Sequence, residues 1–383
     1  MIYSMRTENG KGFGMVTKKR RTDLDLMKII ACVCVVFIHT GKYGHFHFTV
    51  FPFKSLQHHL YFYPAFFSKM AVPLFLAVSG ALLLGREGDT RYHYKKRVSR
   101  SILLLIFGSA VYYVSERFLL GREWLAEDLF YMAIGPGIKY HLWFLYLYVC
   151  FQISVPLLQA MVQNLSDSGF LILFFFGQLE RSRNLFEFLL TGRVDIVNAY
   201  IRPSWMASSV VLFPCLGYYL DHRVKEKDLG KLALGLWCAT IIAMECCYRG
   251  TLLDMARLQQ FGEEYPGTFL ESFDGLFAAT VFITVKMICV KWKAMGSVKD
   301  GISALGSATL GVYLFHAVFN NMPWTYGTYE KLRLMGIPHE IALSCYMLLL
   351  IAPSLLVTWI LHYVPGINRL IGVEKRSVQR GNI

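Results

Sequence analysis

The chain consists of long apolar runs separated by short polar segments. Ten such runs lie at about residues 23–40, 66–85, 101–119, 140–162, 170–176, 204–221, 230–247, 272–292, 302–321 and 339–363. A helix needs about 20 apolar residues to cross a hydrocarbon core about 30 Å thick. The pattern therefore predicts an all-α polytopic integral membrane protein with about ten transmembrane helices. The fifth is the weakest, because Glu180, Arg181 and Arg183 follow it at once.

Lysine and arginine gather on one side of the predicted membrane. They cluster at about 18–21, 86–100, 223–227, 291–299 and 369–380. Cytoplasmic loops carry an excess of these residues, so ten spans predict both termini in the cytoplasm. The segments 41–60, 120–139, 181–203 and 249–270 are then expected outside. We expect one transmembrane domain over residues 23–363, between a basic cytoplasmic N-terminal segment, 1–22, and a basic cytoplasmic tail, 364–383.

The composition supports this class and excludes others. Hydrophobic residues make up 55% of the 383 residues, more than a soluble fold of this size can bury. The net charge of +13 lies in loop clusters, which indicates a lipid bilayer and no nucleic-acid partner. The nine cysteines lie in or beside apolar runs without zinc spacing, and the four histidines of 41–60 form no H-x-x-x-H pair. We therefore expect no metal.

The first apolar run carries two ionisable residues on one face. Lys28 and His39 are eleven residues apart, a step that returns a helix to within about 20° of its starting direction and covers about 16 Å along the axis. Ionisable side chains in a span are costly and usually face a cavity. Snorkelling to the inner interface explains Lys28 alone equally well. The pair on one face favours a functional role.

Three histidines are expected at one level of the membrane. His39 and His316 come late in outward-running helices and His141 comes early in an inward-running one. All three then lie in the outer half, where a neutral histidine is a natural general base. His141 precedes Trp143 and is either an interfacial residue or a pocket residue.

The inner face is expected to present Arg97 and Arg100. Arginine matches the geometry of phosphate, so these residues suit an anionic cytosolic compound that carries phosphates. The ordinary cytoplasmic excess of positive charge also explains them, and more simply. Ser79 belongs to a patch of small residues, 79–81, that permits close approach of two helices. For Ser79 we favour this packing role over a catalytic one.

Several motifs together resemble the bacterial membrane acyltransferase-three proteins, which O-acetylate surface polysaccharides. The motifs are the basic-x10-His pattern Lys28…His39, Pro73-Leu-Phe-Leu-Ala-Val-Ser-Gly80, the Arg-x-x-Arg of 97–100, His141-Leu-Trp-Phe-Leu145, the Gly217-Tyr-Tyr segment and Tyr313-Leu-Phe-His316. They stand in family order over about residues 21–363. Lysine takes the first position of the opening pattern, where arginine is common, and lysine cannot form a fork to a phosphate.

The resemblance implies an O-acyltransferase, by default an O-acetyltransferase, in the bacterial cytoplasmic membrane. The donor would be acetyl-CoA or another acyl-CoA on the cytoplasmic side, and the acceptor a hydroxyl of an envelope polysaccharide or its lipid-linked precursor. The CoA phosphates would lie near Lys28, Arg97 and Arg100, and the thin pantetheine arm would reach His39. His39 would be the general base or an acyl carrier. The expected substrate-binding residues are Ser79, His141, Trp143, Tyr313 and His316.

Two other classes of function fit the same pattern. A membrane transporter of a small amino acid or a lipid-linked sugar would produce flux without consuming acyl-CoA. An accessory protein of polysaccharide assembly, with no activity of its own, would tolerate substitution of Lys28 and His39.

Overall fold

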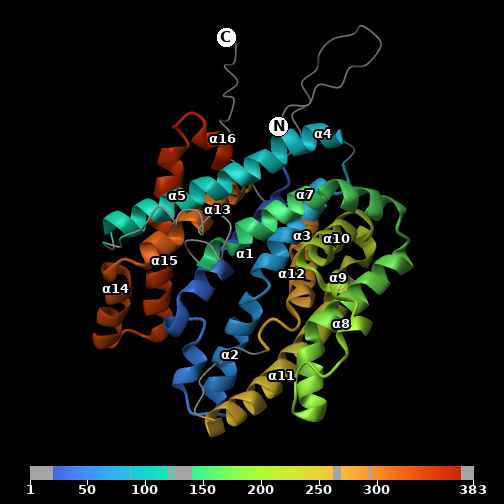
Figure 1. Ribbon diagram of the computed structural model, residues 1–383. Coiled ribbons are helices and arrows are strands. Elements are labelled where there is room, and N and C mark those ends of the chain that lie inside the picture. Colours follow the sequence, from blue (N-terminus) through green and yellow to red (C-terminus); the bar gives the residue numbers. More distant parts are fainter. Residues whose placement is uncertain are drawn as a thin grey trace.

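The computed structural model describes residues 20–86, 88–119, 121, 123, 140–261, 269–292 and 296–371, and these fold into helices without strands (Figure 1). The long helices are α1 (Thr22–His39), α2 (Leu56–Ser68), α3 (Ala71–Leu83), α5 (Ser99–Leu119), α7 (Trp143–Asn164), α8 (Asp167–Thr191), α10 (Ser209–His222), α11 (Leu229–Phe261), α12 (Asp274–Lys291), α13 (Gly296–Asn320), α14 (Pro323–Leu334) and α15 (His339–Leu361). Short helices are α4 (Thr90–His93), α9 (Ser204–Ala207) and α16 (Ile367–Ile371). The all-α prediction is confirmed.

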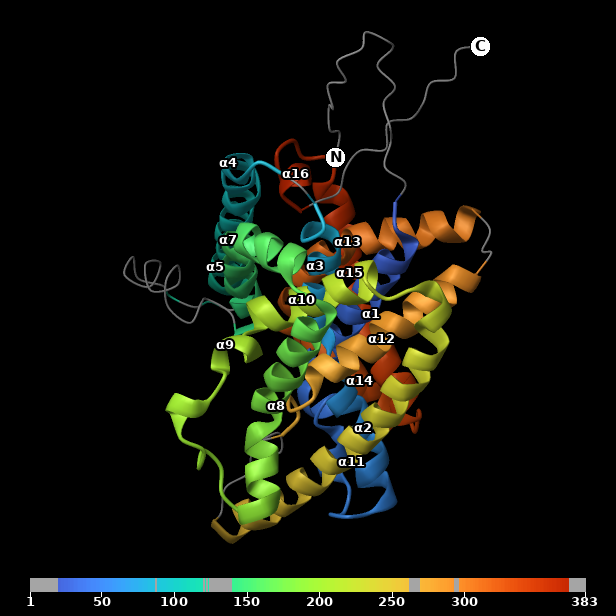
Figure 2. The ribbon, with the colours of Figure 1, turned by 90° about the vertical axis from the view of Figure 1, so that its right-hand side faces the viewer.

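The bundle is built around α1. This helix packs against α3, α12, α13 and α15, and α3 packs along α10. The start of α1 and the short α16 lie at one end of the bundle, while α11 extends to the other end (Figures 1 and 2). The central position of α1 encloses its polar residues: the side chain of Asp25 is only 3% exposed.

Six helical stretches of the described residues are long and apolar enough to cross a membrane. They are Leu56–Leu83, Thr90–Phe118, Trp143–Asn164, Glu226–Arg257, Gly296–Asn320 and His339–Leu361. The chain is therefore a multi-pass membrane protein. Other predicted spans are too polar or too short by this measure: α1 and α12 have 18 residues, three of them charged in each, and α10 has 14. Ten spans and the cytoplasmic placement of both termini stay predictions.

Several predicted boundaries were wrong. The expected loop 41–60 becomes helical at Leu56, where the Ser55 hydroxyl caps α2 by accepting the backbone N–H of His58. The expected external segments 181–203 and 249–270 are entered by α8 and α11, which end at Thr191 and Phe261. An additional helix, α14, precedes α15. Most of 120–139, together with 1–19 and 372–383, lies outside the described residues.

Charge pairing explains why α8 continues past its apolar half. Arg183 lies 2.7 Å from Glu187 one turn later, and Arg202 lies 2.7 Å from Glu180. Ion pairs at this helical spacing stabilise a turn that the apolar pattern does not support. The pairing partners come partly from distant segments, so a search for apolar runs ends the helix too early.

The small-residue patch of 79–81 brings two helices together. A Cβ added to Gly80 would lie 2.0 Å from the backbone oxygen of Pro214, and one added to Gly217 would lie 1.8 Å from that of Ala77. α3 and α10 therefore touch backbone to backbone, as small residues allow. The packing role expected for this patch is confirmed.

Candidate functional site

The structure brings together three histidines from distant parts of the chain. His39 is the last residue of α1, His141 lies in the 3-10 turn Tyr140–Leu142 before α7, and His316 lies in α13. Ring centroids are 4.8 Å apart for His39 and His316, 5.9 Å for His39 and His141, and 5.3 Å for His141 and His316. His141 and His316 are buried. We call this group the histidine cluster.

Hydrogen bonds assign the protons of two of these rings. Nδ1 of His316 lies 2.8 Å from the carbonyl oxygen of Tyr313 and 3.0 Å from that of Val312. A carbonyl only accepts, so Nδ1 carries the proton, and Nε2 of the neutral ring is an acceptor. Nε2 lies 2.6 Å from Nδ1 of His39. His39 therefore donates through Nδ1, which leaves Nε2 of His39 as its basic nitrogen.

Two tyrosines position the third histidine. The hydroxyl of Tyr313 donates to the backbone oxygen of His141. The ring of Tyr112 contacts the His141 ring edge-on at 4.7 Å, and its hydroxyl donates over 2.6 Å to the backbone oxygen of Leu314. The turn that carries His141 is thereby tied to α13, which also carries His316.

The backbone of His39 is held as well as its ring. The side-chain amide of Asn320 donates over 3.0 Å to the carbonyl oxygen of His39, and the hydroxyl of Tyr346 donates over 2.5 Å to the amide oxygen of Asn320. Asn320 comes four residues after His316, so both lie on one face of α13. The sequence analysis missed Asn320 and Tyr346; the four-residue spacing was the available signal for Asn320.

Lys28 lies toward the other end of α1 and belongs to an ion-pair group. Its Nζ is 2.8 Å from Oδ1 of Asp25, and Nε of Arg20 is 2.5 Å from Oδ2 of the same carboxylate. The Lys28 side chain is 25% exposed. Asp25, which the sequence analysis did not single out, is the group that holds Lys28 in place.

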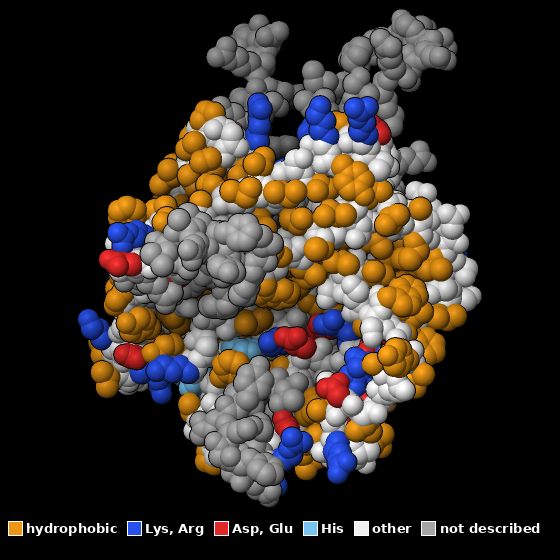
Figure 3. All heavy atoms as spheres, in the orientation of Figure 1, with side chains coloured by type: hydrophobic (Ala, Val, Ile, Leu, Met, Phe, Trp, Pro, Cys, Tyr) orange, Lys and Arg blue, Asp and Glu red, His pale blue; other side chains and the backbone are white. Residues whose placement is uncertain are grey.

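Arg100 sits at the same end of the bundle as the start of α1. Its guanidinium donates to the backbone oxygen of Leu370 in α16, over 3.1 and 3.3 Å. Arg97 lies in the π-helical turn Tyr94–Val98 that leads into α5. Basic side chains gather at this end of the molecule (Figure 3). The arginines and Lys28 therefore share an end, away from the histidine cluster.

The remaining predicted residues lie apart from this geometry. The hydroxyl of Ser79 donates over 2.9 Å to the backbone oxygen of Phe75 in its own helix. The side chain of Trp143 is 50% exposed. The hydrogen bond of Ser79 is consistent with a packing role, and the exposure of Trp143 is consistent with a surface position. In the described part of the chain, no group of three or more His, Cys, Asp or Glu side chains is arranged to hold a metal ion.

One face of the molecule has a recess in which histidine side chains are visible, beside acidic and basic side chains (Figure 3). Lys69, which follows α2, forms an ion pair with Glu271 over 3.1 Å. Lys69 also acts electrostatically on His39.

Comparison with known proteins gives one match. A family model described as an acyltransferase domain, of the acyltransferase-3 type, matches residues 21–363. No curated protein and no solved structure matches the chain.

Proposed function

The chain belongs to the acyltransferase-3 family, whose model covers residues 21–363, and from this we propose that it is a membrane-bound O-acyltransferase. The donor is acyl-CoA on the cytoplasmic side, with acetyl as the acyl group. The acceptor is a hydroxyl of a cell-surface glycan or its lipid-linked precursor, in the envelope of a bacterium. The observation that carries the proposal is the 2.6 Å contact between His39 and His316.

The reaction needs a base, and His39 supplies it. Nε2 of His39 takes the proton of the acceptor hydroxyl while the hydroxyl oxygen attacks the thioester carbonyl. The C–S bond breaks, the acyl group stays on the acceptor oxygen, and the CoA thiolate takes the proton from His39. His316 holds the tautomer that makes Nε2 the basic atom, which is the part that an orienting third group plays in a catalytic triad.

The other residues divide between acceptor and donor. His141 and Tyr313 shape the acceptor side of the histidine cluster, with Trp143 further out. On the donor side, Arg97, Arg100 and Lys28 attract the CoA phosphates, and Asp25 fixes Lys28. A pantetheine arm that follows α1 covers the axial distance of about 16 Å between Lys28 and His39.

Transfer of radiolabel from acetyl-CoA to extracted envelope glycan in purified membranes tests the proposal. We expect transfer by the wild type and a loss of roughly 10²-fold or more for His39→Ala, the scale of general-base catalysis. The matched control is His59→Ala, a histidine of α2 whose partner is Glu245 at 3.1 Å; it should keep its activity. Equal transfer by His39→Ala and the wild type would refute the mechanism. Flux of an amino acid or lipid-linked sugar without acyl-CoA consumption would identify a transporter instead.

A further inference from the structure

A cavity lies close to the end of α1, outside the histidine cluster. We propose that it binds one neutral sugar ring of the acceptor, at a distance from the ring that is acylated, so that the acceptor has more than two linked rings. The inference rests on the proposed acyltransferase function. It adds a binding site and a requirement on acceptor length.

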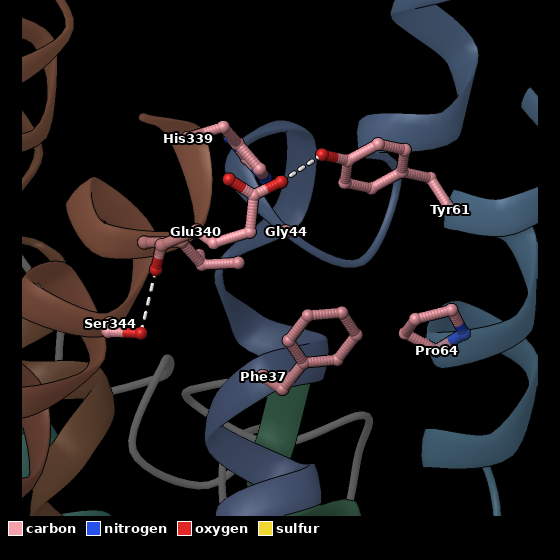
Figure 4. A pocket seen from close by; sticks show the side chains of 8 residues that line it. Phe37, Gly44, Tyr61, Pro64, His339, Glu340 and Ser344 are labelled. Carbon is pink, nitrogen blue, oxygen red and sulfur yellow. Dashed lines mark hydrogen bonds between the residues drawn. The ribbon is translucent and has the colours of Figure 1, made fainter. Parts of the chain in front are cut away.

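The cavity has a volume of about 230 Å³ and lies between α1, α2 and α15. Its lining residues are Phe37, Gly44, Tyr61, Pro64, His339, Glu340, Leu343 and Ser344. Drug-sized ligands occupy pockets of roughly 300–1,000 Å³, so this cavity suits a single ring. Figure 4 shows open space between Glu340 above and the Phe37 and Pro64 rings below.

The lining combines apolar surfaces with groups that bond hydroxyls. Phe37 and Pro64 offer the apolar faces that cover the C–H side of a ring. Glu340 offers a carboxylate, the strongest acceptor for a neutral hydroxyl. The hydroxyl of Tyr61 donates to this carboxylate, which uses one of its roughly four lone-pair directions. A few placed polar groups on an apolar wall are typical of a ligand site.

Nearby positive charge favours a neutral ligand over an amine. A carboxylate beside aromatic rings also suits a cation. However, the guanidinium of Arg333 acts electrostatically on both Glu340 and His339. It donates over 2.6 Å to the backbone oxygen of Ile337, two residues before the start of α15. The positive charge of Arg333 would repel a cationic ligand, whereas it would not repel a neutral hydroxyl.

Contacts with neighbouring side chains hold the polar wall of the cavity without any ligand. The ring of His339 stacks on that of His47 with centroids 3.5 Å apart, and its Nδ1 lies 2.9 Å from the hydroxyl of Tyr329. The ring of Tyr61 stacks on Phe51 at 4.8 Å. Side chains fixed in this way lose little freedom on binding, which favours affinity.

The same wall reaches the histidine cluster. Tyr329 contacts Tyr43 at 4.6 Å, Tyr43 contacts Tyr346 at 5.7 Å, and Tyr346 holds Asn320, which donates to the carbonyl of His39. Phe37 precedes His39 by two residues, which is about 3 Å along the axis and about 200° around it. The cavity and the basic nitrogen thus lie at one level on different faces of α1. A ring in the cavity cannot itself be at His39. Because a helix with its side chains is about 10–12 Å across, the reacting hydroxyl belongs to a ring further along the acceptor than the next one.

The test measures binding by titration calorimetry on the full-length protein in detergent, in the His39→Ala background so that nothing turns over. The probes are methyl glycosides of the monosaccharides released from the envelope glycan, and tetramethylammonium chloride. Removing a charged hydrogen-bond acceptor should weaken glycoside binding roughly tenfold in Glu340→Gln. Tyr61→Phe is the milder variant. The matched control is Glu330→Gln, which alters the carboxylate of another tyrosine–glutamate pair, Tyr43 and Glu330 at 2.6 Å, outside the cavity lining.

Two outcomes overturn the proposal: glycoside binding that is equal in Glu340→Gln and Glu330→Gln, or Glu340-dependent binding of tetramethylammonium alone. A kinetic measurement separates this failure from failure of the proposed function. In an otherwise wild-type chain, Glu340→Gln should raise the KM for an acceptor of several linked rings roughly tenfold and leave the KM for acyl-CoA unchanged. If acyl transfer is lost in His39→Ala but its kinetics are unchanged in Glu340→Gln, the cavity site is refuted and the proposed function is not. Glu340-dependent glycoside binding without any acyl transfer refutes the enzyme and leaves the site.

Discussion

Nδ1 of His39 lies 2.6 Å from Nε2 of His316, although 277 residues separate them in the chain. Two backbone carbonyls of α13 fix the proton of His316 on its other nitrogen. The contact therefore sets the direction of both imidazoles, and it places the basic nitrogen of His39 on the side away from His316. Neither a charge nor a metal is needed for this orientation, since a neutral ring with a fixed tautomer accepts only at one atom.

Substitution of His316 should damage the chemistry more than the binding of substrate. In His316→Phe the acceptor for His39 is lost, and we expect kcat to fall by roughly 10²–10⁴-fold, the range of general-base catalysis. The KM values for acyl-CoA and glycan should stay unchanged. His316→Gln keeps an acceptor oxygen and should recover part of kcat. Steady-state kinetics in membranes measure both.

The double variant checks that the two histidines act as a unit. His39→Ala with His316→Phe should be no slower than His39→Ala alone, because residues of one catalytic unit are strongly non-additive. Independent, multiplying effects of the two substitutions would contradict the orienting role of His316. So would an increase in KM that accounts for the whole loss in His316→Phe.

The contact between α3 and α10 should not accept a single added methyl group. Gly80→Ala and Gly217→Ala each place a Cβ within about 2 Å of backbone oxygen, and overpacking of this kind costs about 1–3 kcal/mol. Gly235→Ala in α11 is the matched control, because nothing lies within 4 Å of its added Cβ. It should be neutral or stabilising by about 0.5–1 kcal/mol. Thermal unfolding in detergent gives the comparison, and equal melting temperatures of all three variants would disprove the close approach.

The buried ion pair between α8 and α12 should respond differently to one substitution and to two. Nε of Arg181 donates over 2.8 Å to Asp274, whose side chain is 4% exposed. Arg181→Met leaves that carboxylate without its partner and should destabilise the protein by about 3–5 kcal/mol. The double variant Arg181→Met/Asp274→Leu should recover most of the loss, because no charge remains buried. A double variant that unfolds at a lower temperature than Arg181→Met would contradict this prediction. It would show that the loss in Arg181→Met does not come from the unpaired buried carboxylate.

The sequence predicted which residues lie close together in several cases, and the structure agrees with some of them. The levels of His39, His141 and His316 followed from counting spans, and the three rings do meet. The small-residue patch at Gly80 also followed from composition, because only small side chains let two backbones touch. Lys28 was grouped with His39, yet its direct partner is Asp25. Asp25 and Lys28 are three residues apart, about one helix turn, and a comparison of residues eleven positions apart does not detect this contact.

The sequence by itself determined that this chain is an all-helical membrane protein, and it predicted that Lys28 and the three histidines fall at two levels. Those properties depend on quantities that can be counted in the sequence, namely the length of an apolar run and the number of residues between two side chains. Tertiary structure alone decided which nitrogen of His39 is basic, which side chain holds its carbonyl, and where α8 and α11 end. Each of these depends on hydrogen bonds or ion pairs with residues far away in sequence, and no local pattern encodes the distance between two helices.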